Sequence, residues 1–295
     1  CLCICYRFDY FYSLYCSVFC ILMILIVDSG ATKAEWRLLL ENGDVQAANT
    51  TGINPYFIRS ESIGNILMNE LPDNWIHESK IGKIYYYGAG CGSEIQEKSI
   101  EKALKAIFPE ANLFISSDLL GAARALWQRD SGYTAILGTG SNAGYFNGQQ
   151  IEKGIKSLGF ILGDEGSGAD LGKRLLKRYL EGKFNQDLAE NFYQQFPFDL
   201  ADFLDAIYSK PFPNRFMAGF VPFMKENSNE IEIQLIVEEA FDDFFGLVQT
   251  IAQSSFRKSI RFTGSVAWAF EEILLGVAAQ HHFEVSLVVK NPIDL

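Results

Sequence analysis

The sequence predicts an α/β protein made of two related halves. Three observations predict this: apolar strand segments alternate with helical ones, one strand-and-turn pattern occurs twice, and the composition is that of a globular chain. Of the 295 residues, 48% are hydrophobic and 21% are charged, which excludes a disordered or fibrous protein. A chain of this length forms one large domain or two of ordinary size.

The repeated pattern consists of an apolar strand, a small-residue loop, a second strand, an Asn-Gly turn and a third strand. The first copy places strands at residues 23–27, 34–40 and 45–48, and the second at 134–137, 143–146 and 150–155. Asn42-Gly43 and Asn147-Gly148 are strong hairpin signals between strands. We therefore expect each half to open with a hairpin whose first loop approaches a ligand.

Helices and further strands follow each copy of the pattern. After the first copy we expect helices at 63–71, 94–108 and from 121 to 127, with buried strands at 84–87 and 113–115. After the second we expect a helix from 168 to about 181 that ends at Gly182. A mixed aromatic segment (184–229), a helix (231–254), a last strand (259–263) and a helix from Val266 complete the chain. The boundary between the halves is expected within 117–132, which gives an N-terminal lobe (23–117) and a C-terminal lobe (118–295).

Residues 1–22 differ in composition from the rest of the chain. They hold five of the six cysteines, and no charged residue occurs between Asp9 and Asp28. A signal peptide, a membrane anchor and upstream sequence preceding a start at Met23 are the three interpretations. The sequence favours the third, because a basic n-region with a cleavage site is absent and an anchor would consume the first strand. The body, with Cys91 as its one cysteine, is expected to be cytoplasmic rather than secreted.

The net charge of −11 argues against a nucleic-acid partner, because phosphate backbones select basic surfaces. Small phosphates remain compatible with an acidic chain, since backbone N–H groups and a cation can hold them. We expect a small-molecule substrate, no nucleic-acid or membrane partner, and a possible homodimer.

The first loop of each half carries residues suited to phosphate chemistry. In the first, Asp28 ends a strand and can hold Mg²⁺, which prefers hard oxygen ligands, while Gly30 allows close backbone approach. Thr32 and Lys33 can donate to phosphate oxygens. The second loop, Gly138-Thr139-Gly140-Ser141-Asn142, offers successive N–H groups and two hydroxyls. It matches neither a Walker A loop nor a Rossmann fingerprint. The alternative is that both are ordinary tight turns.

Three further motifs lie at strand ends or helix starts. Asp118 follows the strand at 113–115 and can accept a proton from a substrate hydroxyl. The alternative is that Asp118 caps the next helix. Asp164-Glu165 lies between glycines before a helix, where acids are also favoured by the helix dipole. The Thr263-Gly264-Ser265-Val266 turn is suited to packing under a flat ring.

In this order the motifs resemble the sugar kinase, Hsp70 and actin superfamily. Within it the chain is similar to the N-acetylglucosamine kinase group of the BadF/BadG/BcrA/BcrD ATPase family. The most specific matches are GTGSN at 138–142, GDEGS at 163–167 and TGSV at 263–266. The resemblance implies an α/β, two-lobed actin-like ATPase (ribonuclease H-like) fold. Each lobe would be a mixed sheet flanked by helices, with the active site in the cleft between the lobes.

The resemblance also implies a role for each matching residue. Asp28 would lie beside Mg²⁺, and Asp118 would be the catalytic base and contact the sugar. ATP would contact Gly30, Thr32, Lys33, Thr139, Gly140, Gly219, Gly264 and Ser265. The sugar would contact Asn54, Ser141, Asn142 and Asp164.

The implied activity is transfer of the γ-phosphoryl group of ATP to an alcohol acceptor. The acceptor expected is the 6-hydroxyl of N-acetylglucosamine or glucosamine. Two alternatives stay open: a BadF/BcrA-type ATPase without sugar kinase activity, and a non-catalytic sensor of sugar or nucleotide. An ATPase that shares an iron–sulfur cluster across a dimer would need two cysteines per chain, whereas Cys91 alone follows Met23.

Overall fold

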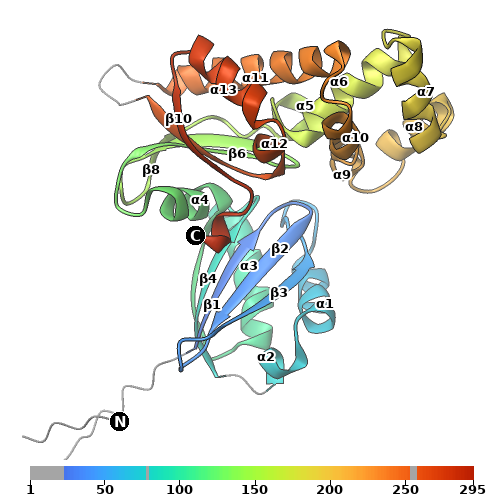
Figure 1. Ribbon diagram of the computed structural model, residues 1–295. Helices are drawn as coiled ribbons and strands as arrows, with labels where there is room; N and C mark the ends of the chain where they lie inside the picture. Colours follow the sequence, from blue (N-terminus) through green and yellow to red (C-terminus); the bar gives the residue numbers. More distant parts are fainter. Residues whose placement is uncertain (1–22, 78–79, 253–257) are drawn as a thin grey trace, which may run out of the picture.

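Two five-stranded sheets, one in each half of the chain, form the centres of two lobes (Figure 1). The computed structural model describes residues 23–77, 80–252 and 258–295. The segment at 1–22, which the sequence sets apart, lies outside the described residues. The predicted α/β, two-lobed architecture is confirmed.

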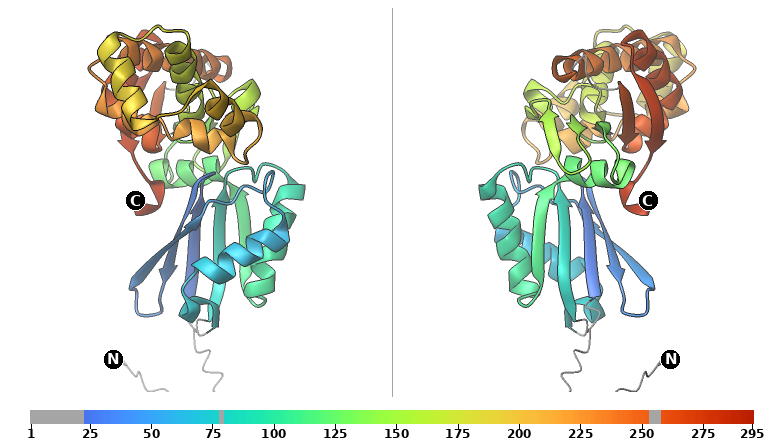
Figure 2. Two further views of the ribbon diagram at one scale, coloured as in Figure 1. Left: turned by 90° about the vertical axis from the view of Figure 1, so that its right-hand side faces the viewer. Right: turned by 90° about the vertical axis from the view of Figure 1, so that its left-hand side faces the viewer.

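The first sheet has the strand order β3-β2-β1-β4-β5. Its strands are β1 (Met23–Ser29), β2 (Lys33–Leu39), β3 (Val45–Thr51), β4 (Ile81–Gly88) and β5 (Asn112–Ser117). The strand β1 is antiparallel to β2 and parallel to β4, so the sheet is mixed. Its helices are α1 (Ser60–Glu70), α2 (Asp73–His77) and α3 (Glu94–Ile107). Helices α1 and α3 pack together beside the sheet, as Figure 2 shows.

The second sheet, ordered β10-β9-β6-β7-β8, repeats the topology of the first. Its strands are β6 (Gly132–Leu137), β7 (Ser141–Phe146), β8 (Ile151–Gly154), β9 (Ser259–Thr263) and β10 (Glu284–Val289). The hairpin β6-β7-β8 corresponds to β1-β2-β3, and the parallel strands β9 and β10 correspond to β4 and β5. Gly43 and Gly148 have φ of 90° and 94°, the backbone that the Asn-Gly turns require.

Most helices of the C-terminal lobe lie between β8 and β9. They are α5 (Gly159–Leu162), α6 (Gly168–Leu180), α7 (Gln186–Gln195), α8 (Leu200–Tyr208), α9 (Pro213–Ala218), α10 (Val221–Glu226) and α11 (Ile231–Ile251). After β9 come α12 (Ser265–Ala269) and α13 (Glu271–Gln280). Phe192, Phe203 and Phe220 are buried with their rings in mutual contact. The mixed aromatic segment is therefore a set of short helices around a phenylalanine core.

Three expectations about the elements are wrong. The strand at 259–263 is not the last, because β10 follows it. The sequence does carry a signal for β10, because four of its six residues are apolar. The helix expected from Gly121, α4 (Asp118–Trp127), begins at Asp118 instead. The long helix expected over 231–254 ends at Ile251, and Ser254 lies outside the described residues.

Two segments connect the lobes. Helix α4 follows β5 and contacts strands of both sheets. The C-terminal 3₁₀ turn η1 (Pro292–Asp294) returns to the first lobe, where Asp294 pairs with Arg37 of β2 at 2.6 Å. Because α4 touches both sheets, a lobe boundary after residue 117 stays a prediction.

No helix in the described ranges is long and apolar enough to cross a bilayer.

Candidate active site

The loop between β1 and β2 is a tight turn locked by its neighbour. The N–H of Gly30 donates to the Lys33 carbonyl at 3.0 Å, and the N–H of Gly52 donates to the Thr32 carbonyl at 2.9 Å. A Cβ on Gly52 would lie 2.5 Å from the Gly30 carbonyl oxygen, so only glycine fits there. The end of β3 and the β1–β2 loop therefore form one packed unit.

The loop between β6 and β7 is held by the start of α6. The N–H groups of Gly168 and Ala169 donate to the Gly138 and Thr139 carbonyls at 2.7 and 3.1 Å. Gly264, with φ of 115°, packs from the other side, and a Cβ there would lie 2.3 Å from the Leu137 carbonyl oxygen. These contacts explain why glycines occur in three separate motifs around one loop.

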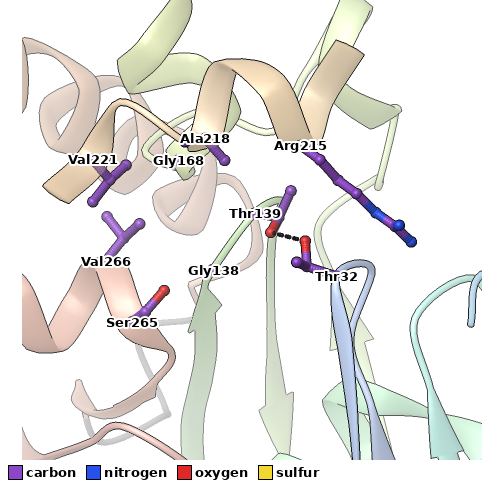
Figure 3. A pocket seen from close by; sticks show the side chains of 10 residues that line it. Thr32, Gly138, Thr139, Gly168, Arg215, Ala218, Val221, Ser265 and Val266 are labelled. Carbon is purple, nitrogen blue, oxygen red and sulfur yellow. Dashed lines mark hydrogen bonds between the residues drawn. The ribbon is translucent and has the colours of Figure 1, made fainter. Parts of the chain in front are cut away.

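The two loops face each other across the lobes. The side-chain oxygens of Thr32 and Thr139 are 2.9 Å apart, and Figure 3 shows this bond at the edge of a pocket. The pocket has a volume of about 170 Å³. Its lining residues are Thr32, Gly138, Thr139, Gly168, Arg215, Ala218, Gly219, Val221, Ser265 and Val266. Four predicted nucleotide contacts, Thr32, Thr139, Gly219 and Ser265, thus share one pocket.

Three carboxylates lie near these loops with raised pKa values. Burial, then the charges of Asp118 and Glu35, raise the pKa of Asp28 to about 7. Burial raises the pKa of Asp118 to about 6. Burial also raises the pKa of Asp164 to about 6, with the charges of Glu165 and Asp118 adding to it. In the described part of the chain none of the three has an ion-pair partner, so their negative charges are uncompensated.

Local geometry orients Asp118 and Asp164. The carboxylate of Asp118 accepts the N–H of Leu119 at 2.8 Å. The helix cap is Ser117, whose hydroxyl accepts the N–H of Leu120. The alternative that Asp118 is the capping residue is therefore wrong. Asp164 has φ of 61°, an uncommon backbone for a non-glycine residue, and its carboxylate accepts the Ser141 N–H.

Other predicted residues have local partners. Lys33, with its side chain half-exposed, pairs with Glu35 at 2.5 Å and does not line the pocket. The side-chain Oδ1 of Asn54 accepts the Tyr56 N–H at 3.0 Å. The side-chain Oδ1 of Asn142 accepts the N–H of Ala143 at 2.9 Å. Gly140 lies against Asp164, since a Cβ there would be 3.1 Å from its carboxylate. These roles stay predictions.

Sequence reasoning missed five pocket residues: Gly168, Arg215, Ala218, Val221 and Val266. Arg215 lies on the short helix α9 in the aromatic segment, where no motif marks it. Gly168 follows directly after the GDEGS match, so its place beside the loop could have been inferred from that motif. Val266 belongs to the TGSV match.

The residues present fit both groups that the fold family implies. The pocket walls are small and neutral apart from Arg215, and three hydroxyl residues, Thr32, Thr139 and Ser265, line it, which suits a phosphorylated ligand. Asp28 is a carboxylate without a cation partner among the described residues, so a divalent cation there would offset its charge. The described residues contain no group of three or more His, Cys, Asp or Glu side chains that could hold a metal ion. Mg²⁺ would accordingly take one carboxylate and complete its shell with phosphates and waters.

Comparison with solved structures places the fold. A proposed N-acetylglucosamine kinase from Porphyromonas gingivalis is 36% identical, with a TM-score of 0.84 over 92% of this chain and 96% of the other. One from Chromobacterium violaceum is 17% identical, with a TM-score of 0.67 over 91% and 94%. A ROK family glucokinase from Streptomyces griseus, in complex with glucose and AMPPNP, is 13% identical, with a TM-score of 0.55 over 91% and 93%. The last two show the fold alone. No protein-family model and no curated protein matches the sequence.

The fold and the paired glycine loops define a protein of the sugar kinase, Hsp70 and actin superfamily. Within it, the chain belongs to the N-acetylglucosamine kinase-like family represented by the Porphyromonas gingivalis protein.

Proposed function

We propose that this protein is an ATP-dependent sugar kinase that phosphorylates the 6-hydroxyl of N-acetylglucosamine or glucosamine. The observation that carries the proposal is the meeting of Thr32 and Thr139 over one pocket. The buried Asp118 is close enough to Asp28 and Asp164 for its charge to raise their pKa values. The 36% identical protein, described as a proposed N-acetylglucosamine kinase, supports the acceptor sugar.

In the proposed reaction the chain's own residues do mainly positioning. The two loops hold the phosphates through backbone N–H groups and the hydroxyls of Thr32 and Thr139. The Asp118 carboxylate takes the proton of the sugar hydroxyl as its oxygen bonds to the γ-phosphorus and the β–γ bridge breaks. Phosphoryl transfer depends largely on such alignment and on charge stabilisation. Mg²⁺, held by Asp28, would supply neutralisation of the phosphate charge.

The sugar side is assigned to residues around the carboxylates. Asn54, Ser141, Asn142 and Asp164 would contact the sugar, with Gly264 and Ser265 beside the adenosine. The Asp164 carboxylate lies against Gly140, next to Ser141 and Asn142 in the chain, and would accept a sugar hydroxyl there. Closure of the lobes would exclude water and suppress ATP hydrolysis.

The test is ADP release with and without each sugar. Purified protein with Mg·ATP should release ADP only when N-acetylglucosamine or glucosamine is present, and sugar 6-phosphate should accumulate in equal amount. Asp118→Asn serves as the matched inactive control, because it keeps the shape of the side chain. ADP release without sugar would instead support the ATPase alternative. Binding of sugar or nucleotide without turnover would support the sensor alternative.

A further inference from the structure

Arg215 bridges the two lobes at the edge of the pocket. It lies on α9 in the C-terminal lobe, and its Nε donates to the Ala31 carbonyl of the N-terminal lobe at 2.8 Å. Its Nη2 donates to the Ala31 carbonyl as well and to the Gly52 carbonyl at 3.2 Å. In Figure 3 the side chain extends from α9 past Thr32. Of the ten residues that line the pocket, Arg215 alone is charged.

The carbonyls of Ala31 and Gly52, which accept from Arg215, belong to segments with different predicted roles. Ala31 lies in the β1–β2 loop, directly before Thr32. Gly52 lies two residues before Asn54, the predicted sugar contact. Besides the Gly52–Thr32 hydrogen bond, the Ser29 hydroxyl accepts the Ile53 N–H and donates to the Ile53 carbonyl, both at 3.2 Å. These hydrogen bonds tie the segment that leads to Asn54 to the β1–β2 loop.

The guanidinium is also held from its own lobe. It lies over the ring of Phe212, 4.2 Å from the centroid, and Phe212 itself has a left-handed φ of 59°. Helix α9 is capped at its C-terminus by Gly219, whose N–H donates to the Arg215 carbonyl at 3.0 Å. Gly219 lines the pocket on the predicted adenosine side. One six-residue helix thus connects the interlobe contact to the nucleotide pocket.

We propose that Arg215 is a positioning residue that couples sugar binding to nucleotide binding. This inference rests on the proposed function. The guanidinium fork holds α9 and Gly219 against the segment that leads to Asn54. A sugar bound at Asn54 stabilises that segment and, through the fork, the arrangement of α9 and Gly219 that forms the nucleotide pocket. Arginine suits this role because its planar donors reach two carbonyls at once, whereas the lysine ammonium is a single flexible point charge.

The competing role is direct contact of Arg215 with a nucleotide phosphate. In that case the positive charge is what binds the nucleotide, and Arg215→Lys should retain part of the nucleotide affinity. Loss of the side chain would then weaken nucleotide binding equally with and without sugar. The coupling role predicts that only the effect of sugar on the nucleotide Kd is lost, and that Arg215→Lys does not restore this effect.

The experiment is calorimetry of a non-hydrolysable ATP analogue with Mg²⁺, with and without saturating N-acetylglucosamine. It compares wild type with Arg215→Met, Arg215→Lys and Arg37→Met. The last variant is the matched control, because Arg37 also ties the lobes but does so through Asp294, away from the pocket. Thermal melting of each variant monitors folding, and if Arg215→Met is unfolded, Arg215→Lys carries the comparison.

In wild type we expect the sugar to lower the nucleotide Kd by a factor within the usual coupling range of about 5–150. Both Arg215 variants should bring that factor close to one, while Arg37→Met should keep the wild-type factor. Retention of the factor in Arg215→Met would overturn the inference, as would equal weakening in both conditions with rescue by lysine. Sugar-dependent ADP release with no coupling in wild type would refute the inference and leave the proposed function standing. A wild type that binds no sugar would refute both.

Discussion

The hydroxyls of Thr32 and Thr139 are 2.9 Å apart although 107 positions separate them in the chain. Each belongs to the first loop of its own half, so the bond joins the two copies of the repeated hairpin. Two hydroxyls that bond each other can instead donate to an oxyanion placed between them. The site is therefore arranged symmetrically around the point where the nucleotide phosphates are proposed to bind.

Replacement of Thr139 by valine should weaken nucleotide binding. A hydrogen bond to a charged group is worth about 1.5–3 kcal/mol, so the Kd for the ATP analogue should rise by roughly 10- to 100-fold. Calorimetry measures it, and Thr139→Ser, which keeps the hydroxyl, should stay within a few-fold of wild type. Equal affinities for the valine and serine variants would remove Thr139 from the phosphate contacts.

Asp28→Asn should weaken nucleotide binding only when Mg²⁺ is present. With Mg²⁺ the variant lacks the anionic ligand that the cation prefers. In EDTA the same variant should bind the nucleotide at least as tightly as wild type, because a carboxylate that repels phosphate is gone. Sugar affinity should change by less than a few-fold. Identical losses with and without Mg²⁺ would argue against a metal role for Asp28.

Asp118→Asn should lower kcat far more than it changes KM. Asparagine keeps the shape of the side chain but cannot take the substrate proton, and general base catalysis contributes about 10²–10⁴-fold. Steady-state kinetics on the folded variant measure this loss. Activity within a few-fold of wild type would mean that the base lies elsewhere, with Asp164 the next residue to replace.

The rate should fall on the acid side of neutrality. Asp118 must be ionised to accept a proton, and the pKa of its carboxyl in the free protein is about 6. Below that pH the carboxyl is protonated, so kcat/KM should drop by about tenfold per pH unit. Asp28, with a pKa of about 7, adds to the decline where Mg²⁺ binding is incomplete. A profile that is flat down to pH 4.5 would contradict the assignment of Asp118.

Asp118→Asn should also stabilise the ligand-free protein against unfolding. The pKa of Asp118 is higher in the folded than in the unfolded chain, so the folded state binds the proton more tightly. Ionisation above pH 6 therefore destabilises the fold, and the neutral asparagine avoids this. Asp118→Asn should raise the free energy of unfolding by the order of 1–2 kcal/mol at pH 8, since the partly accessible carboxylate retains some hydration. Below about pH 4, where both states of wild type are protonated, the gain should vanish. Denaturant unfolding at the two pH values measures it, and a variant less stable than wild type at pH 8 would contradict the account.

The sequence alone determined the hairpins and most of the parallel strands. Gly43 and Gly148 have the positive φ that glycine adopts most readily, so the hairpin turns follow from local chemistry. Apolar runs likewise indicated β4, β5 and β9. The edge strand β10 was missed although four of its six residues are apolar, a pattern that by itself predicts a strand. Ser117 rather than Asp118 caps α4, a choice between adjacent capping residues that the sequence leaves open.

Only the tertiary structure decided which residues share the site. The Thr32–Thr139 bond and the contact of Arg215 with Ala31 and Gly52 join positions more than 100 residues apart. No periodicity or turn signal encodes such contacts, because they depend on how one lobe packs against the other. The raised pKa values of Asp28 and Asp118 have the same origin. Burial of both groups, and the effect of the Asp118 charge on Asp28, exist only after the fold brings two strand ends together. Each carboxylate by itself is an ordinary acid in a turn.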